Sequence, residues 1–367
     1  MTVSVKSTEN DKSRVERIEH AVQAWISPEN SDLKEAVERT VREGLFPRED
    51  VYYQLQALTR AVSVHHLSNW YASVRKRLPN ETLDRRNPRE VLTVHAGNIP
   101  LAGFQDVVSV ALSGSIYHGK YSKRDPWILP TLVKYLESEG LLSVETAHTE
   151  LQASYSQLSD IFFSGGTDSW EALSSDLSGR GVQMDRVRTL KRTAQFSVAI
   201  LDKAHPATMK ELVQAMALYD GRGCRSVAMV LTELPLEEIK CSLGDYFEAF
   251  WLQHPQRTRR TEKLRVRAAY NRAMGRPFTW LDSILVEESD DRPDETGIVH
   301  WCRTDRTRFP KILESIGDRL QSIYVPVSDI EVAGFESRTE LLDASQTPPI
   351  NWRPDGIDPL EWLMQLN

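Results

Sequence analysis

Cysteine is scarce in this chain of 367 residues, which has only Cys224, Cys241 and Cys302. Zinc knuckles and redox CxxC motifs need closely spaced cysteines, and a disulfide framework needs more of them, so the sequence excludes all three. The N-terminal residues are polar, and the apolar region of a signal peptide is missing. An odd number of cysteines without a signal peptide is typical of a reducing compartment, so we expect a cytoplasmic protein.

Long apolar runs and an excess of positive charge are also missing. No stretch approaches the roughly 18 apolar residues that a membrane span requires, and no spacing predicts a metal site. The 52 acidic against 45 basic residues give a net charge of −7, which argues against a nucleic-acid-binding protein. We interpret the one basic run, residues 256–267, as a solvated helix face, with contact to a polyanion such as coenzyme A as an alternative.

The order of helical and β-rich patterns predicts an α/β protein. Helical spacing dominates residues 14–26, 32–45 and 49–78 and ends at the polar run 79–89. Strand-like and helical runs then alternate, which is typical of βαβ units and a mostly parallel sheet. The predicted strands are 91–95, 115–121, 160–166, 194–202 and 226–233, and the predicted helices are 101–114, 126–140, 167–177 and 206–220.

The segment YDGRGCRSV makes Cys224 the candidate nucleophile. It lies between a predicted helix and a predicted strand, and Gly221 and Gly223 allow the backbone to turn tightly and approach a ligand. Arg222 and Arg225 supply positive charge, which favours the thiolate. A thiolate in a glycine-rich loop at a sheet edge suits covalent catalysis, although a loop cysteine without a role is the simpler alternative.

The other two cysteines carry weaker signals. Cys241 has helical spacing, and we expect a small buried residue there. Cys302 follows His300 by two residues on a predicted strand, so the two side chains share a face, and a catalytic pair is the weaker hypothesis.

Two predicted strand ends carry polar candidates. Asn98, in HAGNIP, could donate its side-chain amide to a developing oxyanion, whereas a plain turn role is the commoner use of asparagine. We interpret His95 as a hydrogen-bonded histidine at a sheet end rather than a base. Lys120 ends the strand 115–121 and points toward the expected ligand crevice.

A double glycine, Gly165 and Gly166, joins a predicted strand to a predicted helix. Asp168 and Glu171 form a predicted capping box at the start of that helix. A glycine turn into a helix N-terminus can bind phosphate, and a plain βα turn is the alternative.

Together these segments resemble the acyl-CoA reductases of the LuxC type, a branch of the aldehyde dehydrogenase superfamily. The resemblance runs from about residue 90 to the C-terminus, through HAGNIPLAGFQDVVSVALSGS, GKYSKRDPWILP, FSGGTDSWEAL, SVAILD, YDGRGCRSV and SQTPPINWRPDGIDPLEWL. Its most specific pieces are GRGCRSV and the pairing of HAGNIPL with Lys120, Ser122 and Asp125 in a Lys–x–Ser–x–x–Asp pattern.

The resemblance implies a fold and a set of roles. The fold is aldehyde-dehydrogenase-like, with two parallel-sheet, Rossmann-like domains and a helical N-terminal segment. Cys224 would form the thioester intermediate, and Asn98 would stabilise the oxyanion. The implied cofactor-binding residues are Lys120, Ser122, Gly165, Gly166 and Thr167.

The expected domains follow from the resemblance and the composition. They are a helical segment over 1–89 packed on the cofactor domain, an NAD(P)-binding domain over 90–203, a catalytic domain over 204–343 and a tail over 344–367 that docks on the body. Within the tail we expect a helix over 358–366, and within the catalytic domain an exposed loop over 287–297.

One departure from the superfamily pattern predicts the direction of the reaction. Aldehyde dehydrogenases carry a Glu–Leu–Gly–Gly motif before the strand that here is SVAIL, and that Glu activates the water that hydrolyses the acyl-enzyme. The matching stretch here, LKRTAQF, contains no acid. It therefore favours a reductase, in which hydride rather than water reaches the acyl group.

The expected reaction is the reduction of an acyl-CoA, or an acyl-protein thioester, to an aldehyde. NADPH is favoured over NADH because Lys120, Lys123 and Arg124 could meet a 2′-phosphate. The family implies an acyl-protein synthetase or ligase as a partner, and a homo-oligomer. Two alternatives stay open: an aldehyde-oxidising or phosphate-releasing member of the superfamily, and a non-catalytic nucleotide- or acyl-binding protein.

Overall fold

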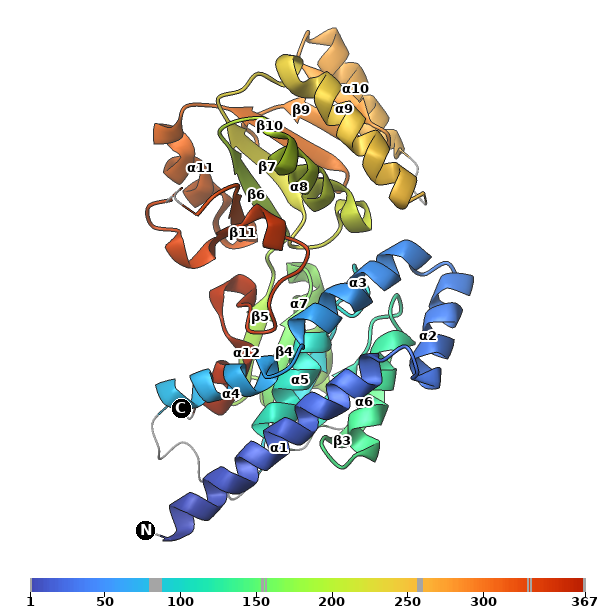
Figure 1. Ribbon diagram of the computed structural model, residues 1–367, viewed down its shortest axis with the longest axis vertical. Helices are drawn as coiled ribbons and strands as arrows, with labels where there is room; N and C mark the ends of the chain where they lie inside the picture. The colour runs from blue at the N-terminus through green and yellow to red at the C-terminus, as the bar shows by residue number, and fades with distance from the viewer. Residues whose placement is uncertain are drawn as a thin grey trace. The chain divides into compact units, whose positions relative to one another are not determined.

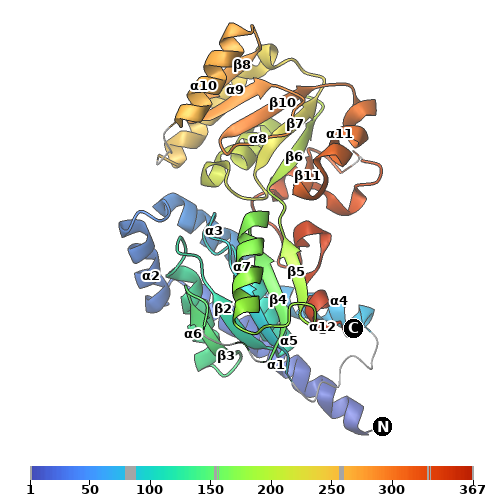
Figure 2. The same ribbon diagram turned by 180° about the vertical axis from the view of Figure 1, so that it is seen from behind.

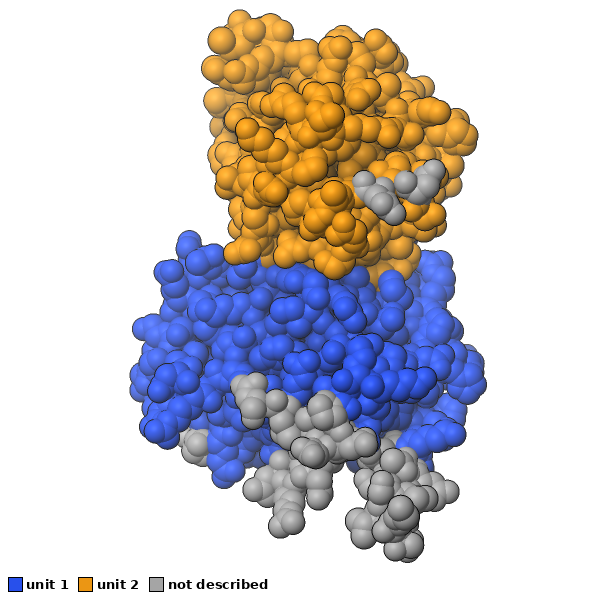
Figure 3. Space-filling view, turned by 90° about the vertical axis from the view of Figure 1, so that its left-hand side faces the viewer, with its two compact units in different colours: residues 1–193, 349–367 blue, residues 194–348 orange. Residues whose placement is uncertain are grey.

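The computed structural model describes residues 2–78, 88–152, 155, 157–255, 260–328, 330 and 332–365, with side chains from Lys12 onward. The chain divides into two compact units, which Figure 3 shows in different colours. Unit 1 contains residues 1–193 and 349–367, and unit 2 contains residues 194–348. Among the described helices, none is both long and apolar enough to cross a membrane.

Unit 1 is built around a five-stranded parallel sheet with the order β3-β2-β1-β4-β5. Helices cover both faces, because α5 and α6 share a core with Val91 whereas α7 shares one with Leu92 (Figures 1 and 2). The strands are β1 (Glu90–Val94), β2 (Ile116–Lys120), β3 (Ser143–His148), β4 (Leu158–Ser164) and β5 (Arg188–Arg192), and the helices are α5 (Phe104–Ser113), α6 (Ile128–Ser138) and α7 (Thr167–Gly179).

Four helices precede this sheet: α1 (Thr2–Ile26), α2 (Ser31–Arg42), α3 (Arg48–Ala61) and α4 (His66–Arg77). The Trp25 ring of α1 stacks on Phe104 with centroids 6.0 Å apart, and its Nε1 donates a 2.9 Å hydrogen bond to Thr131 Oγ1. The single helix expected over 49–78 is wrong, because the chain turns at His65, whose φ is 67°. Residues 79–87 of the predicted polar boundary lie outside the described residues.

The C-terminal segment completes unit 1 through α12 (Pro359–Met364). The Asp358 carboxylate caps this helix and accepts a 3.1 Å hydrogen bond from Trp70 Nε1. Arg77 pairs with the same carboxylate at 3.2 Å and with Glu361 at 2.8 Å. Leu360 and Leu363 are fully buried in the core that α1, α5 and α6 share.

Unit 2 contains a seven-stranded sheet with the order β12-β11-β6-β7-β10-β9-β8, parallel except between β8 and β9. Its strands are β6 (Phe196–Leu201), β7 (Val227–Thr232), β8 (Phe278–Leu281), β9 (Ile284–Glu288), β10 (Ile298–Arg303), β11 (Leu320–Val325) and β12 (Thr339–Leu341). Its helices are α8 (Pro206–Ala217), α9 (Leu236–Gln253), α10 (Glu262–Ala273) and α11 (Phe309–Ile316). Short 3-10 turns in the chain are Leu218–Gly221, Arg306–Arg308, Gly317–Arg319, Glu336–Arg338, Leu342–Ala344 and Pro354–Gly356.

The borders between the units differ from the predicted ones. The first falls at 193/194 rather than 203/204, because β6 pairs with β7 and β11 in the second sheet. The second falls at 348/349 rather than at Ala344, so the start of the expected tail belongs to unit 2.

The predicted exposed loop over 287–297 begins too early. Glu287 lies in β9 and is 1% exposed. Burial raises its pKa, but hydrogen bonds from His300, Arg267 and Asn271 outweigh burial and bring the pKa to about 2. These bonds tie α10 to the sheet.

Part of the basic run 256–267 forms ion pairs. Arg267 bonds to Glu287 at 2.8 Å, and Lys263 pairs with Glu295. Residues 256–259 of the run lie outside the described residues.

Candidate active site

Cys224 lies in the loop between α8 and β7 of unit 2. The 3-10 turn at the start of this loop contains Tyr219, Asp220 and Gly221, whose φ angles of 57°, 55° and 68° are all left-handed. Left-handed backbone costs free energy for tyrosine and aspartate, and such strained residues cluster at functional sites. Cys224 itself is partly exposed.

This loop is held at the amino ends of two parallel strands. Val227, three residues after Cys224, begins β7. The Ser197 hydroxyl, near the start of β6, donates a 3.0 Å hydrogen bond to the Cys224 carbonyl oxygen. Ligand crevices in α/β proteins usually lie at the carboxyl edge, so unit 2 presents its thiol from the opposite edge.

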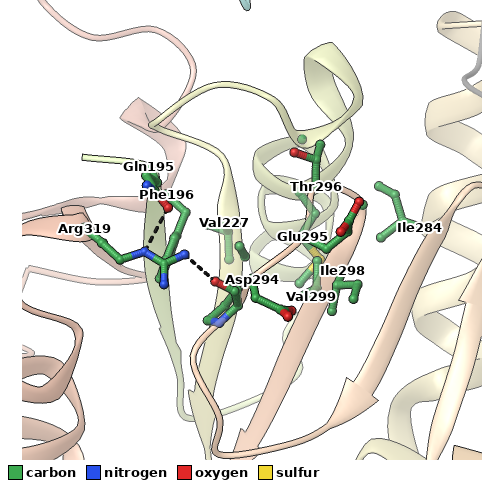
Figure 4. A pocket seen from close by; sticks show the side chains of 15 residues that line it. Gln195, Phe196, Val227, Ile284, Asp294, Glu295, Thr296, Ile298, Val299 and Arg319 are labelled. Atoms are coloured by element: carbon green, nitrogen blue, oxygen red, sulfur yellow. Dashed lines mark hydrogen bonds between the residues drawn. The ribbon is translucent and has the colours of Figure 1, made fainter. Parts of the chain in front are cut away.

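A cavity of about 120 Å³ opens at the same amino edge (Figure 4). Gly221, from the turn before Cys224, and Val227 both line it. Beside them, Arg319 donates from Nε to Gln195 Oε1 at 2.8 Å and from Nη2 to the carbonyl oxygen of Pro293 at 2.7 Å. The loop of the candidate nucleophile therefore forms part of a cavity wall.

The two arginines expected to favour the thiolate have different surroundings. Arg225 is 6% exposed, and its Nε donates a 2.6 Å hydrogen bond to the carbonyl oxygen of Ser345. Its guanidinium also pairs with Glu340 at 3.2 Å, so a carboxylate already balances its charge. Arg222 is more exposed and lies 3.8 Å from Asp220. Arg225 therefore serves to anchor the loop.

The other cysteines have different environments. Cys302 is buried in β10, and burial raises the pKa of its thiol to about 11. Both ring nitrogens of His300 face other groups, the carbonyl oxygen of Asp291 at 2.7 Å and Glu287 at 3.3 Å. The expectation that Cys241 is buried is wrong, since it is exposed on α9.

In unit 1, the predicted residues gather at the carboxyl edge of the sheet. Strands β2, β1 and β4 are neighbours, and their carboxyl ends carry Lys120, the Asn98 loop and Gly165 in that order. The strand order reverses between β1 and β4, with the chain continuing to β2 and β3 on one side and to β5 on the other. Such a switch point is where doubly wound α/β folds bind nucleotides.

The loop that carries Asn98 is fixed at both ends. Asn98 is partly buried. Before it, the His95 N–H donates a 3.0 Å hydrogen bond to the carbonyl oxygen of Lys120. After it, the Leu101 N–H donates a 2.8 Å hydrogen bond to Asp125 Oδ2. The loop therefore lies against the one that follows β2.

His95 has a structural environment, as interpreted from the sequence. Its Nε2 lies 2.7 Å from the Tyr117 hydroxyl, and its ring stacks on Tyr121 with centroids 5.8 Å apart. Burial lowers its pKa to about 4, which keeps the imidazole neutral.

The loop after β2 contains a tight turn. The Asp125 N–H donates a 3.1 Å hydrogen bond to the carbonyl oxygen of Ser122. Lys123 is exposed and pairs with Glu150 at 2.8 Å. Lys120 is partly buried and Arg124 is exposed.

The glycine turn after β4 begins α7 without a side-chain cap among the described residues. The predicted capping box is wrong, because Gly166 is the N-cap and Asp168 lies within the helix. A Cβ placed on Gly166 would meet no atom within 4 Å. Open space before the uncapped N–H groups of Thr167 and its neighbours fits the pyrophosphate of a dinucleotide at the switch point.

The stretch LKRTAQF runs from β5 into unit 2. Arg192, in this stretch, pairs with the buried Asp106 at 2.6 Å. Sequence reasoning missed a carboxylate that approaches it: Asp355 Oδ2 accepts a 3.1 Å hydrogen bond from the Thr193 N–H. The sequence separation between Asp355 and Thr193 hides this contact. In the part of the chain that the structure describes, no group of three His, Cys, Asp or Glu residues could hold a metal ion.

No family model matches this sequence, and no curated protein matches it either. The structure is similar to aldehyde dehydrogenase 21 from Physcomitrella patens in complex with succinate, at 12% identity over 96% of this chain and 84% of that one, with a TM-score of 0.67. It is also similar to the glyceraldehyde-3-phosphate dehydrogenase GapN from Methanocaldococcus jannaschii complexed with NADP, at 13% identity over 96% and 92%, with a TM-score of 0.60. A third similar structure is betaine aldehyde dehydrogenase from Staphylococcus aureus in complex with NAD⁺, at 12% identity over 87% of this chain and 71% of that one, with a TM-score of 0.58.

These similarities define the fold. The chain has the α/β fold of the aldehyde dehydrogenase superfamily, with two mostly parallel sheets and N-terminal helices. The fold class predicted from the sequence is confirmed.

Proposed function

We propose that this protein is an NAD(P)H-dependent reductase that converts an acyl-CoA, or an acyl-protein thioester, to an aldehyde through a thioester at Cys224. The place of Cys224 carries the proposal. It is a partly exposed thiol beside a strained turn, in a fold that aldehyde dehydrogenases share. Cys302 is buried and Cys241 lies on a helix surface, so neither has a comparable setting.

The proposed chemistry begins with nucleophilic attack by Cys224. Cys224 Sγ attacks the thioester carbonyl carbon, and the CoA thiol leaves, so one difficult reduction becomes two easier steps. The Asn98 side-chain amide and the Cys224 N–H stabilise the oxyanion that forms.

The cofactor, when bound, supplies the hydride that reduces the acyl group. Gly165, Gly166 and Thr167 offer backbone N–H groups at the switch point for its phosphates. Lys120 and Ser122, on the neighbouring strand end, hold its ribose. Since Lys123 pairs with Glu150, Lys120 and Arg124 are the better candidates for a 2′-phosphate, and NADPH remains favoured over NADH.

The direction of the reaction rests on the missing acid. LKRTAQF contains no carboxylate. Asp355 approaches the stretch from the C-terminal segment, but its Oδ2 already accepts the Thr193 N–H. On this basis the proposed exit of the acyl group from Cys224 is hydride transfer rather than hydrolysis.

The test of this function is the oxidation of NADPH and NADH over a chain-length series of acyl-CoAs, with aldehyde and free CoA measured together. Wild type should consume reduced cofactor only with acyl-CoA and release one CoA per aldehyde. Cys241→Ala, a matched control that removes an exposed thiol, should behave like wild type. An enzyme that reduces NAD(P)⁺ with aldehydes and never oxidises NAD(P)H with acyl-CoA would contradict the proposal.

A second test omits the cofactor. With acyl-CoA alone, wild type should accumulate a stable acyl group on Cys224, visible by intact-protein mass spectrometry and removed by hydroxylamine. Rapid release of free acid would show that another base activates water. If Asp355→Asn then stopped that release, the protein would be an aldehyde oxidiser with a relocated base, which is the second candidate function.

A non-catalytic binding protein is distinguished by alkylation. The thiol of an active enzyme should label faster at Cys224 than at the exposed Cys241, whereas equal rates would favour a protein that kept the fold without the activity. An acyl-protein synthetase or ligase that supplies acyl groups, and a homo-oligomeric state, belong to the same proposal.

A further inference from the structure

Asp125 ends the Lys–x–Ser–x–x–Asp pattern, and its carboxylate is buried. The side chain is 3% exposed, although aspartate is among the residues least often buried without partners. Burial raises its pKa to about 6, while backbone N–H groups of Leu101, Ile128 and Leu129 oppose that rise. A buried carboxylate is retained at a cost, so its contacts merit a functional explanation.

The strongest of these contacts is with the Asn98 loop. The Leu101 N–H donates to Asp125 Oδ2 at 2.8 Å, three residues after Asn98. Leu101 has a left-handed φ of 57°, a conformation that costs a leucine free energy and persists only where the surroundings fix it. The bond to Asp125 supplies part of that restraint.

The two loops also pack closely upstream of Asn98. A Cβ placed on Gly97 would lie 2.0 Å from Ser122 Oγ, so the Gly97 backbone and the Ser122 side chain are in contact. The His95 N–H bonds to the carbonyl oxygen of Lys120 at 3.0 Å. Contacts at 95, 97 and 101 therefore bracket Asn98 and join its loop to the one carrying Lys120 and Ser122.

We propose that Asp125 is a positioning residue that fixes Asn98 for oxyanion stabilisation and couples the Asn98 loop to the cofactor-binding loop. This inference rests on the proposed function. It explains why HAGNIPL and the Lys–x–Ser–x–x–Asp pattern occur together in one sequence: the aspartate of the second motif bonds to the last residue of the first. Asp125 touches no reacting group in this scheme and acts through Asn98.

A purely structural role for Asp125 is the competing explanation. Ile128 and Leu129 lie in the first turn of α6, so Asp125 also supports the start of that helix. Losing a purely structural contact lowers stability whether or not Asn98 is present, whereas losing a positioning residue slows acylation only when Asn98 is present. A double-mutant cycle separates these two effects.

The experiment measures the rate at which acyl-CoA acylates Cys224, without cofactor, by quenched-flow mass spectrometry. Asn98→Ala should slow acylation on the order of 10²–10³-fold. Asp125→Ala, which removes the acceptor of the Leu101 N–H, should slow it about tenfold, and the double variant should be no slower than Asn98→Ala alone. If the two effects multiply instead, Asp125 does not act through Asn98, and the proposal is overturned.

Asn30→Ala is the matched control. Asn30 caps α2 in the same unit by accepting the Leu33 N–H at 3.1 Å. Its loss should lower thermal stability while leaving the acylation rate unchanged. A slowing equal to that of Asp125→Ala would show that general destabilisation explains both variants.

Hydrogen exchange of the loop 95–101 gives a readout that needs no acyl chemistry. Asp125→Ala should speed exchange of the Leu101 amide at least tenfold, because its acceptor is lost, and Asn30→Ala should not. An unchanged exchange rate of the Leu101 amide would overturn the positioning role of Asp125, even if the enzyme is active. If wild type is never acylated by any acyl-CoA, the proposed function fails and the positioning role fails with it, while the exchange result still decides whether Asp125 restrains the loop.

Discussion

The two units present their candidate residues from opposite ends of their strands. In unit 1, the Asn98 loop, Lys120 and Gly165 follow β1, β2 and β4 at the carboxyl edge. In unit 2, Cys224 precedes β7 and lies at the amino edge. The carboxyl edge of a doubly wound sheet offers a binding place by its topology alone, because the chain order reverses there.

The amino edge of the sheet in unit 2 has no such general binding place, so the local loop must supply the geometry of the candidate site. Three successive left-handed residues reverse the chain before Cys224, and the Ser197 hydroxyl and the Arg225 guanidinium hold the loop in place. The proposed cofactor site in unit 1 thus depends on topology, whereas the proposed nucleophile in unit 2 depends on a specific loop. The following changes test that difference.

The largest effect is expected from Cys224→Ala. Aldehyde formation should fall by about 10⁴-fold or more, because the covalent route is removed, while binding of NADPH measured by fluorescence should persist. Cys302→Ala is the control, since it removes a buried thiol and should leave turnover intact. An essential Cys302 would show that the wrong loop has been assigned to catalysis.

Asn98→Ala comes next. An oxyanion donor acts mainly in the transition state, so kcat should fall on the order of 10²–10³-fold with little change in KM. Steady-state kinetics with a saturating cofactor would measure both constants. An unchanged kcat would show that Asn98 is only a turn residue. The proposed role of unit 1 would then be limited to cofactor binding.

The pH dependence of stability separates two buried groups of unit 1. Asp125 has a pKa raised to about 6, so the folded chain holds its proton more tightly, and its contribution to the free energy of unfolding falls as pH rises from 4 to 6. His95, with a pKa lowered to about 4, contributes the opposite slope over nearly the same range. Each contribution amounts to about 3 kcal/mol.

In wild type the falling contribution of Asp125 and the rising contribution of His95 to the free energy of unfolding oppose each other. The variant Asp125→Asn should therefore reveal the rising contribution of His95. Relative to wild type, this variant should gain about 3 kcal/mol in the free energy of unfolding between pH 4 and 6, measured by urea titration. Parallel curves for the two proteins would mean that Asp125 does not titrate in the folded state.

The smallest effect is expected from Gly97→Ala. The added methyl would lie 2.0 Å from Ser122 Oγ, so one of the two loops must move, at a cost of about 1–3 kcal/mol. Gly179→Ala at the end of α7 is the matched control, because its Cβ would meet nothing within 4 Å. Thermal unfolding of both variants should show a lower midpoint for Gly97→Ala alone.

The sequence predicted β1, β2, β4, β6 and β7, but it missed the edge strands and also β11 and β9, which lie inside the second sheet. β1, β4, β6 and β7 are mostly buried, and each is therefore rich in apolar residues. β3 and β5 are edge strands of the first sheet, and their sequences, SVETAH and RTLKR, are polar as edges require. The break between α3 and α4 was hidden because no Gly or Pro marks it.

The residues of the candidate site that follow strands could be predicted from the sequence. The contacts between residues far apart in the sequence could not. Asn98, Lys120 and Gly165 follow recognisable strands, so their common edge could be predicted. The bond from Leu101 to Asp125 requires a leucine in left-handed backbone, which no sequence pattern announces. Asp355 reaches Thr193 from the far end of the chain.

The C-terminal segment has a consequence for how the protein is made. The first 193 residues share their unit with residues 349–367, so translation must reach this later segment before that unit is complete. Until then Trp70 lacks its carboxylate acceptor Asp358, and the core lacks Leu360 and Leu363. Unit 2, which is continuous in sequence, emerges whole from the ribosome first. Unit 1 begins to be synthesised first and is finished last, and a nascent or truncated polypeptide exposes the core residues against which Leu360 and Leu363 of α12 would pack.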